Sequence, residues 1–168
     1  MDGLRAESIV HPWQVERMRQ IYLECRPWLS VQDLPDRSEV EQQEWWNSIK
    51  GHSKAFLYSP SEEPWKFVAF SLLRKKSANI VSPMIGIAEE YRGKGYARKI
   101  IQHYISAAGG ALAGSARSDH TQILRLNYEL GWQEVGEKDG MILLYHPGCI
   151  ENHRQEEIYR EILRYHGY

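Results

Sequence analysis

The sequence is poor in cysteine and has no long apolar run, and each shortage excludes a class of protein. Its two cysteines, Cys25 and Cys149, lack Cys-x-x-Cys spacing, so neither a disulfide framework nor a cysteine-rich zinc site is indicated, and we expect no metal. No apolar run approaches the roughly 20 residues that span a bilayer, and the first ten residues, MDGLRAESIV, lack the pattern of a signal peptide. The sequence therefore predicts a cytoplasmic protein with no membrane partner.

An excess of charge of one sign is also missing. The net charge is -1, so the chain has no positive field to hold a polyanion, and we expect no nucleic-acid partner. What is present is the balance of a folded protein, with 42% apolar and 26% charged residues. The 168 residues contain no internal repeat or low-complexity linker, which predicts a single domain over residues 1–168.

The first third of the chain predicts two helices. The stretch HPWQVERMRQIYLECRPW has one apolar face, and we expect this helix to end before Pro27. That face is formed by Val15, Met18, Ile21 and Tyr22. The second helix covers RSEVEQQEWWNSIK, with Asp36 or Ser38 as its cap and Gly51 as its stop.

From residue 53 onward, strands and helices alternate. KAFLYS and WKFVAFSLLRKK predict a hairpin, and ANIVSPMIGIA predicts a further strand in which Pro83 indicates a bulge or splay. An amphipathic helix from about Gly95 to Ala108 precedes a small-residue strand, GALAGSA. The helix HTQILRLNYEL ends at Gly131, and WQEVGEKDGMILLYH predicts two strands joined by a turn.

The last eighteen residues, ENHRQEEIYREILRYHGY, differ in composition from the part of the chain that precedes them. Ile158, Ile162 and Tyr165 recur at helical spacing, so residues 150–168 predict an appended C-terminal helix. Together these elements predict an α/β (α+β) fold, a mixed sheet with helices on its faces.

The stretch EYRGKGYA places two glycines around a lysine where a helix begins. The first amide groups of a helix have no helical partners, and with the helix dipole they favour an anion. A P-loop would require Ser or Thr after Lys94, and a dinucleotide fingerprint would require a glycine where Arg98 stands. The remaining pattern is R-x-x-G-x-A, formed by Arg92, Gly95 and Ala97.

This pattern resembles the acyl-CoA-binding motif Q/R-x-x-G-x-G/A of the GNAT superfamily of N-acetyltransferases. A later LGW followed by EVG resembles the family's LGF-xxVG ending, so the likeness covers roughly residues 30–146. The resemblance implies the acyl-CoA N-acyltransferase fold, with a mostly antiparallel sheet. It also implies acetyl-CoA as co-substrate.

The resemblance further implies which residues hold the cofactor. The diphosphate would bind the main-chain amides of Arg92, Gly93, Lys94, Gly95, Tyr96 and Ala97, aided by the charges of Arg92 and Lys94. In the family, the fourth strand splays from the fifth and the pantetheine arm inserts between them. The main chain that would hold this arm belongs to Met84, Ile85, Gly86 and Ile87.

The catalytic positions depart from the family pattern. The family often has an Asn twelve residues before the aromatic residue of LGF and a Tyr five residues before it. Counting back from Trp132 gives His120 and Asn127, with Tyr128 adjacent. Asn127 and Tyr128 are therefore the catalytic candidates, and His120 either bonds the cofactor or caps its helix. The general base stays open among Glu24, Glu44, His52 and Ser82.

The acceptor is predicted to be a primary amine of a small molecule, such as an amino sugar. Trp45 and Trp46 lie where the family places its acceptor-side helix, and Trp28 lies in the loop that would border the acceptor pocket. A protein N-terminus or side-chain amine is the alternative acceptor. A different alternative is a regulatory module that binds acyl-CoA without turnover. The oligomeric state is open, and a homodimer is among the states allowed.

Overall fold

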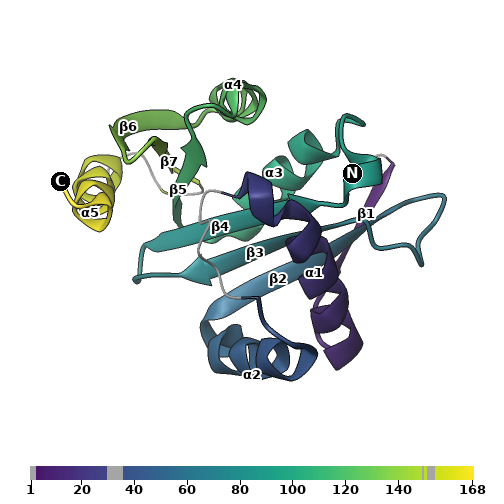
Figure 1. Cartoon of the computed structure of the whole chain (residues 1–168). Coiled ribbons are helices and arrows are strands. Elements are labelled where there is room, and N and C mark those ends of the chain that lie inside the picture. Colours follow the sequence, from purple (N-terminus) through teal and green to yellow (C-terminus); the bar gives the residue numbers. More distant parts are fainter. Residues whose placement is uncertain (1–2, 30–35, 149, 151–153) are drawn as a thin grey trace. The chain divides into compact units, whose positions relative to one another are not determined.

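In a computed structural model, the chain forms a mixed α/β structure, and the structure describes residues 3–29, 36–148, 150 and 154–168 (Figure 1). In these residues seven strands form a sheet in the order β1-β2-β3-β4-β5-β7-β6. The strands are β1 (Leu4–Ser8), β2 (Ser53–Pro60), β3 (Ala69–Lys75), β4 (Ile80–Ile87), β5 (Ala111–Arg117), β6 (Gln133–Lys138) and β7 (Met141–His146). β4 and β5 run parallel, whereas the pairs β1–β2, β2–β3, β5–β7 and β6–β7 are antiparallel. The predicted fold class is confirmed.

The helices follow the predicted segments closely. They are α1 (Pro12–Cys25), α2 (Glu39–Ile49), α3 (Tyr96–Ala107), α4 (Thr121–Glu129) and α5 (Gln155–His166). Three short 3-10 turns accompany them: η1 (Arg26–Trp28), η2 (Lys50–His52) and η3 (Glu89–Tyr91). In the part of the chain described here, no helix has both the length and the apolar character needed to cross a membrane.

The chain divides into two compact units, which we describe separately. The first unit comprises Met1–Arg74 and Met84–Ile100, and the second comprises Lys75–Pro83 and Ile101–Tyr168. The division falls within β4, within α3 and before the last residue of β3.

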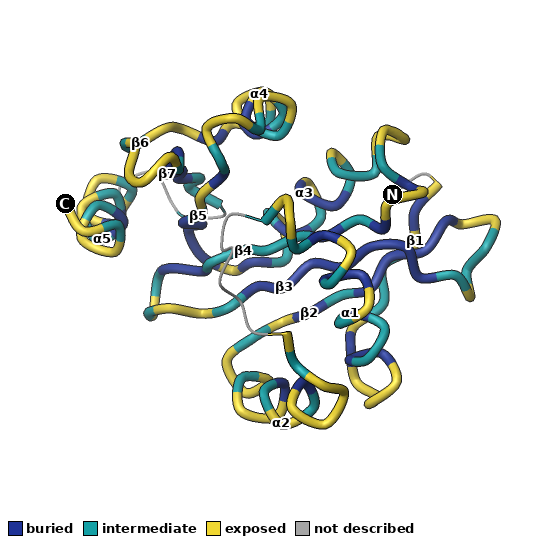
Figure 2. The backbone as a smooth tube through the Cα atoms, in the orientation of Figure 1, coloured by how far each residue is buried: buried dark blue, intermediate teal, exposed yellow. Residues whose placement is uncertain are grey.

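In the first unit, the two N-terminal helices form where the sequence predicts them. The predicted apolar face of α1 is buried, and the helix ends at Cys25 before Pro27. Of the two candidate caps of α2, Ser38 is the one used: its amide donates to the Glu41 carboxylate at 2.7 Å, and its hydroxyl accepts from the Glu41 amide at 3.3 Å. Figure 2 shows β2 and β3 as mostly buried strands of this unit.

Two features of the first unit differ from the sequence-based expectation. Gly51 does not stop α2, because the helix ends at Ile49 and continues as η2 without a left-handed residue at position 51. β1 was not predicted, because its five residues, LRAES, show no strong apolar alternation. Its strand conformation comes from antiparallel pairing with β2, in which Leu4 is opposite Pro60.

In the second unit, α5 covers a core that includes residues of β4, β5 and β7. The buried core residues are Ile80, Ala111, Ala113, Tyr145, Ile158 and Ile162. The predicted turn between β6 and β7 is a two-residue loop, with φ of 52° at Asp139 and 73° at Gly140, which suits a hairpin of the type I′ class. Gly131 follows α4 with φ of 89°, as its sequence position predicts.

Candidate active site

The segment between β4 and α3 forms an open loop of main-chain amides in the first unit. Gly93 and Gly95 adopt φ of 74° and 78°, and a Cβ at either position would meet no atom within 4 Å. The Arg92 amide donates to the Glu89 carbonyl at 3.2 Å, whereas the amides of Gly93, Lys94 and Gly95 make no hydrogen bond within the described part of the chain. These amides precede Tyr96, the first residue of α3. An anion at this position would find unpaired donors and the positive end of a helix dipole.

Two lysines add positive charge to the base of this loop. The Nζ atoms of Lys94 and Lys66 lie 4.5 and 5.0 Å from the centre of the Tyr91 ring. Tyr91 is buried and stacks on Tyr96, with 6.3 Å between ring centroids. Lys66 also lies 3.7 Å from the Glu90 carboxylate. The tyrosine ring thus holds both cations beside the loop.

The Arg92 side chain turns toward the protein. Its Nε donates to the Ile87 carbonyl at 3.0 Å, and its Nη2 donates to the Glu24 carbonyl at 3.1 Å. The same Nη2 lies 3.8 Å from the Cys25 sulfur. The guanidinium is therefore engaged by groups at the ends of α1 and β4. Sequence reasoning did not find these contacts, because Arg92 and Glu24 are 68 positions apart.

The end of β4 that belongs to the first unit carries the four residues predicted to hold the pantetheine arm. Met84, Ile85 and Ile87 are half-buried, and Gly86 is buried. A Cβ on Gly86 would overlap the Phe70 ring and lie 3.1 Å from the Cys25 sulfur. Glycine is required at this position by the close approach of those side chains.

In the second unit, the ladder between β4 and β5 is short. It pairs Ile80 with Ala111 and Val81 with Leu112, whereas β5 continues its pairing with β7 as far as Arg117. Pro83 has no amide hydrogen to donate, so a regular ladder cannot pass through it. The irregularity predicted from Pro83 is found at the expected place.

The catalytic candidates of the second unit lie on α4. Asn127 is 7% exposed, and its Oδ1 has no hydrogen-bond partner among the described residues. Tyr128 is 43% exposed, and its hydroxyl donates to the Glu134 carboxylate at 2.9 Å. Burial and this carboxylate raise the pKa of Tyr128 above its usual value. A buried acceptor without a partner is costly in a folded protein, so Asn127 fits a site that a ligand or water completes.

His120 occupies the N-cap position of α4 but makes no side-chain capping bond. Its main-chain carbonyl accepts from Ile123 and Leu124, at 3.1 and 3.2 Å. The neighbouring Asp119 forms a 2.6 Å ion pair with Arg117. Of the two roles considered for His120, side-chain capping is not the one that the structure shows.

The predicted acceptor residues occupy different environments in the first unit. Trp28, on η1, is 57% exposed, whereas Trp46 is 6% exposed and packs in the core. Trp45 is half-buried, and the Arg37 guanidinium lies 4.9 Å from the centre of its ring. Among the candidate bases, the Glu24 carboxylate accepts the Glu89 amide at 3.1 Å. Of the three predicted acceptor residues, Trp28 and Trp45 are therefore the ones whose side chains remain accessible.

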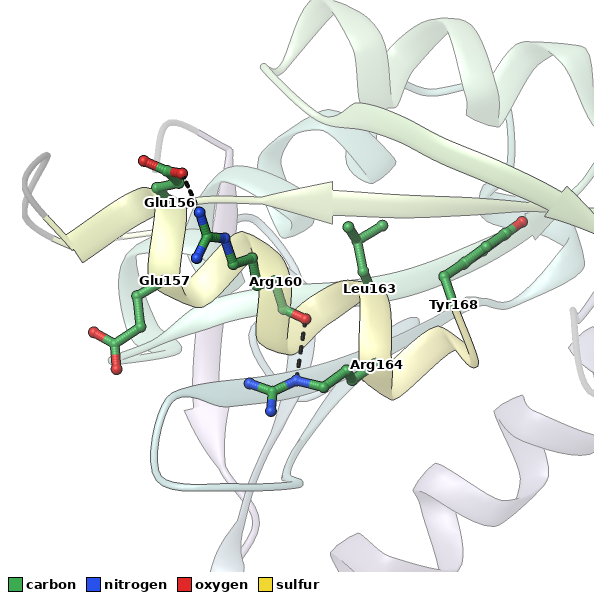
Figure 3. Close-up of a pocket in the computed structure, with 6 residues that line it drawn as sticks. All are labelled: Glu156, Glu157, Arg160, Leu163, Arg164 and Tyr168. Atoms are coloured by element: carbon green, nitrogen blue, oxygen red, sulfur yellow. Dashed lines mark hydrogen bonds and ion pairs between the residues drawn. The ribbon is translucent and has the colours of Figure 1, made fainter.

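A further hollow lies along α5 in the second unit (Figure 3). It is lined by Glu156, Glu157, Arg160, Leu163, Arg164 and Tyr168. Arg160 forms a 2.6 Å ion pair with Glu156, and Arg164 donates to the Arg160 carbonyl at 3.4 Å. Glu156, Arg160 and Arg164 already have partners on the same helix, so we treat the hollow as a feature of the helix surface.

Comparison with known proteins identifies the family. The model of the acetyltransferase (GNAT) family matches residues 15–122, more than half of the chain. None of the curated protein sequences matches this chain. In the described residues, no group of three or more His, Cys, Asp or Glu side chains is placed to hold a metal ion.

Solved structures share the fold at low sequence identity. Spermidine N-acetyltransferase from Vibrio cholerae, solved with CoA and spermine, is 16% identical with a TM-score of 0.73, covering 87% of this chain and 96% of its own. An inferred phosphinothricin N-acetyltransferase is 18% identical with a TM-score of 0.72, covering 88% and 99%. An inferred acetyltransferase from Salmonella typhimurium, solved with acetyl-CoA, is 12% identical with a TM-score of 0.70, covering 89% and 96%. The chain therefore belongs to the GNAT family of acetyltransferases, enzymes whose co-substrate is acetyl-CoA.

Proposed function

We propose that this enzyme transfers an acetyl group from acetyl-CoA directly to the primary amine of a small molecule. The observation that carries the proposal is the loop before α3, where the amides of Gly93, Lys94 and Gly95 are unpaired within the described residues. Both glycines adopt a left-handed conformation that leaves open space above the main chain. A diphosphate is the group that such a loop suits.

The chain's own residues would act mainly by binding and orientation. The thioester of acetyl-CoA supplies an acetyl group that is already activated for transfer. The loop amides would hold the diphosphate, and the main chain of Met84–Ile87 would orient the pantetheine arm, with one amide polarising the thioester carbonyl. In the second unit, the unpaired Oδ1 of Asn127 is an acceptor that could orient a water, whereas a thioester carbonyl would have to accept from the Asn127 amide nitrogen.

The small-molecule acceptor is supported by two observations. The similar structures include a spermidine N-acetyltransferase and an inferred phosphinothricin N-acetyltransferase, whose names specify small amines. In this chain Trp28 offers an exposed ring, and the Trp45 ring is half-buried. Rings of this kind stack on the apolar faces of sugars, which supports an amino sugar as the acceptor.

The test combines binding with turnover. Calorimetry with acetyl-CoA should show binding, and thiol release should then be followed with amino sugars, polyamines, amino acids and peptides with free N-termini. Thiol release with small amines supports the proposal, and preferential release with peptides favours the protein acceptor. Tight binding without release for any amine favours a regulatory module. Absence of acetyl-CoA binding would overturn the assignment of the loop.

The oligomeric state of this chain is a separate part of the proposal. One similar structure is a dodecameric spermidine N-acetyltransferase from Vibrio cholerae, so oligomers occur on this fold. For this chain we propose a homodimer. Light scattering during size-exclusion chromatography should give twice the 19.6 kDa mass of one chain, and a mass of one chain would contradict it.

A further inference from the structure

We propose that Arg92 is a positioning residue that ties the diphosphate loop to the end of α1, where the turn of Arg26–Trp28 begins. The inference deepens the proposed function and rests on it for the identity of the ligand. Arg92 begins the R-x-x-G-x-A pattern, yet its guanidinium bonds the Ile87 carbonyl at 3.0 Å and the Glu24 carbonyl at 3.1 Å. The positive charge of the Arg92 side chain is thus directed to carbonyl groups of the protein itself.

The contacts form a compact network of five residues in the first unit. The Cys25 thiol, 5% exposed, donates to the same Ile87 carbonyl at 3.2 Å, and its sulfur lies 3.8 Å from Arg92 Nη2. The Glu24 carboxylate accepts the Glu89 amide at 3.1 Å. The last two residues of α1 are therefore held by four polar contacts: one to Ile87 at the end of β4, one to Glu89 of η3 and two to the Arg92 side chain.

The chemistry of the guanidinium explains why arginine suits this position. The last carbonyls of a helix have no helical partner, and a cation near them is favoured by the helix dipole. The planar guanidinium offers several donors in a fixed arrangement, so one side chain reaches two carbonyls together. A lysine has the same charge but a single ammonium group, and it cannot reproduce this bridge.

The network connects the cofactor loop to the segment that carries Trp28, a predicted acceptor residue. Arg92 connects main chain next to the loop amides with Glu24, and Arg26–Trp28 follow directly in the chain. Acetyl-CoA that fixes the loop would also restrict the end of α1. We expect bound acetyl-CoA to restrict the turn that carries Trp28.

Cys25 provides a direct readout of this network. The experiment measures alkylation of Cys25 by iodoacetamide, quantified by mass spectrometry. All variants are made in the Cys149→Ser protein, which is called the parent and keeps Cys25 as its single cysteine. Without ligand, Arg92→Lys should speed labelling by about tenfold, the factor expected for loss of a hydrogen bond to a charged group, because it keeps a positive charge beside the Cys25 thiol. Arg92→Gln should speed labelling less, because burial raises the pKa of that thiol, Arg92 opposes this rise, and the removal of Arg92 leaves less thiolate. Lys50→Gln is the control, because it removes one positive charge from the first unit outside the loop, at a side chain that bonds Asn47, and it should label like the parent.

The second arm adds saturating acetyl-CoA, which has no free thiol. Labelling should slow in the parent and in Lys50→Gln, and it should stay unchanged in both Arg92 variants, whose folding is checked by thermal unfolding. The inference is overturned by an Arg92→Lys variant that labels like the parent, or by a parent in which bound acetyl-CoA leaves labelling unchanged. Failure of the parent to bind acetyl-CoA overturns the proposed function and the coupling, while labelling without ligand still decides whether Arg92 holds α1.

Discussion

The side-chain amide of Asn79 donates a hydrogen bond to the Glu161 carboxylate, with 3.0 Å between Nδ2 and Oε2. The Ser77 hydroxyl donates to the other oxygen at 2.5 Å. These bonds join the residues before β4 to α5, whose Ile158 and Ile162 are fully buried. The predicted C-terminal helix is therefore an integral part of the second unit.

Replacing Glu161 by Ala should lower the free energy of unfolding by about 1–2 kcal/mol, since it removes both bonds from a partly exposed carboxylate. Hydrogen bonds from Ser77 and then Asn79 lower the pKa of Glu161. Its contribution is thus present above the unfolded pKa of about 4.3 and is lost as the pH falls through the folded pKa. Urea denaturation at pH 7 and at pH 3 measures both effects. Glu157→Ala, on the exposed side of α5, is the control and should change stability by less than about 0.5 kcal/mol.

Replacing Gly95 by Val should weaken acetyl-CoA binding by about tenfold or more, because the side chain would fill the space where the diphosphate approaches. Gly109→Val is the matched control, since Gly109 also has a positive φ, 68°, and open space around its Cβ position. Both variants should lose about 1–3 kcal/mol of stability through backbone strain. Calorimetric affinity that falls equally in the two variants would contradict the loop assignment.

Replacing Asn127 by Ala should reduce kcat/KM by about tenfold to a hundredfold, the range expected for loss of one buried hydrogen bond. Tyr128→Phe should change it by less than about threefold, because the Tyr128 hydroxyl is directed to Glu134 and the loss of one exposed bond has a small effect. Steady-state thiol release with the best acceptor measures both. A larger loss in Tyr128→Phe than in Asn127→Ala would make Tyr128 the catalytic residue.

The stability of the chain should fall as the pH drops from 7 to 5, in part through His146. The Gly148 amide donates to its Nδ1 at 2.9 Å, so Nε2 carries the proton and faces the Leu130 carbonyl at 3.2 Å. Burial lowers the pKa of His146 in the folded state. Below the unfolded value of about 6.5, the unfolded chain therefore binds more protons, and stability rises with pH.

The variant His146→Gln should reduce the slope of unfolding free energy against pH in this range. A residual slope is expected, because burial also lowers the pKa values of His103 and His166. Urea titrations at half-unit pH steps measure the slope. An unchanged slope would show that His146 accepts its proton equally in both states.

Local signals in the sequence were sufficient to predict most of the fold. Ser38 followed three residues later by Glu41 specifies the start of α2, and Asp139-Gly140 specifies the hairpin turn. β1 could not be predicted, because its conformation depends on pairing with β2, about 50 residues away. Gly51 was misjudged because a glycine stops a helix only when the chain turns left-handed there.

The candidate site likewise combines features that the local sequence predicts with features that depend on tertiary packing. The glycines of the loop before α3 follow from local sequence, since open space and positive φ depend on Gly93 and Gly95 themselves. The partners of Arg92 and the unpaired oxygen of Asn127 depend on tertiary packing. No spacing rule specifies such contacts.

Pro83 has a consequence for strand pairing in the second unit. The ladder of Ile80 with Ala111 and Val81 with Leu112 ends two residues before Pro83, which has no backbone N–H to donate. The missing donor is a property of the covalent structure, so Pro83 cannot supply that hydrogen bond whether or not acetyl-CoA is bound.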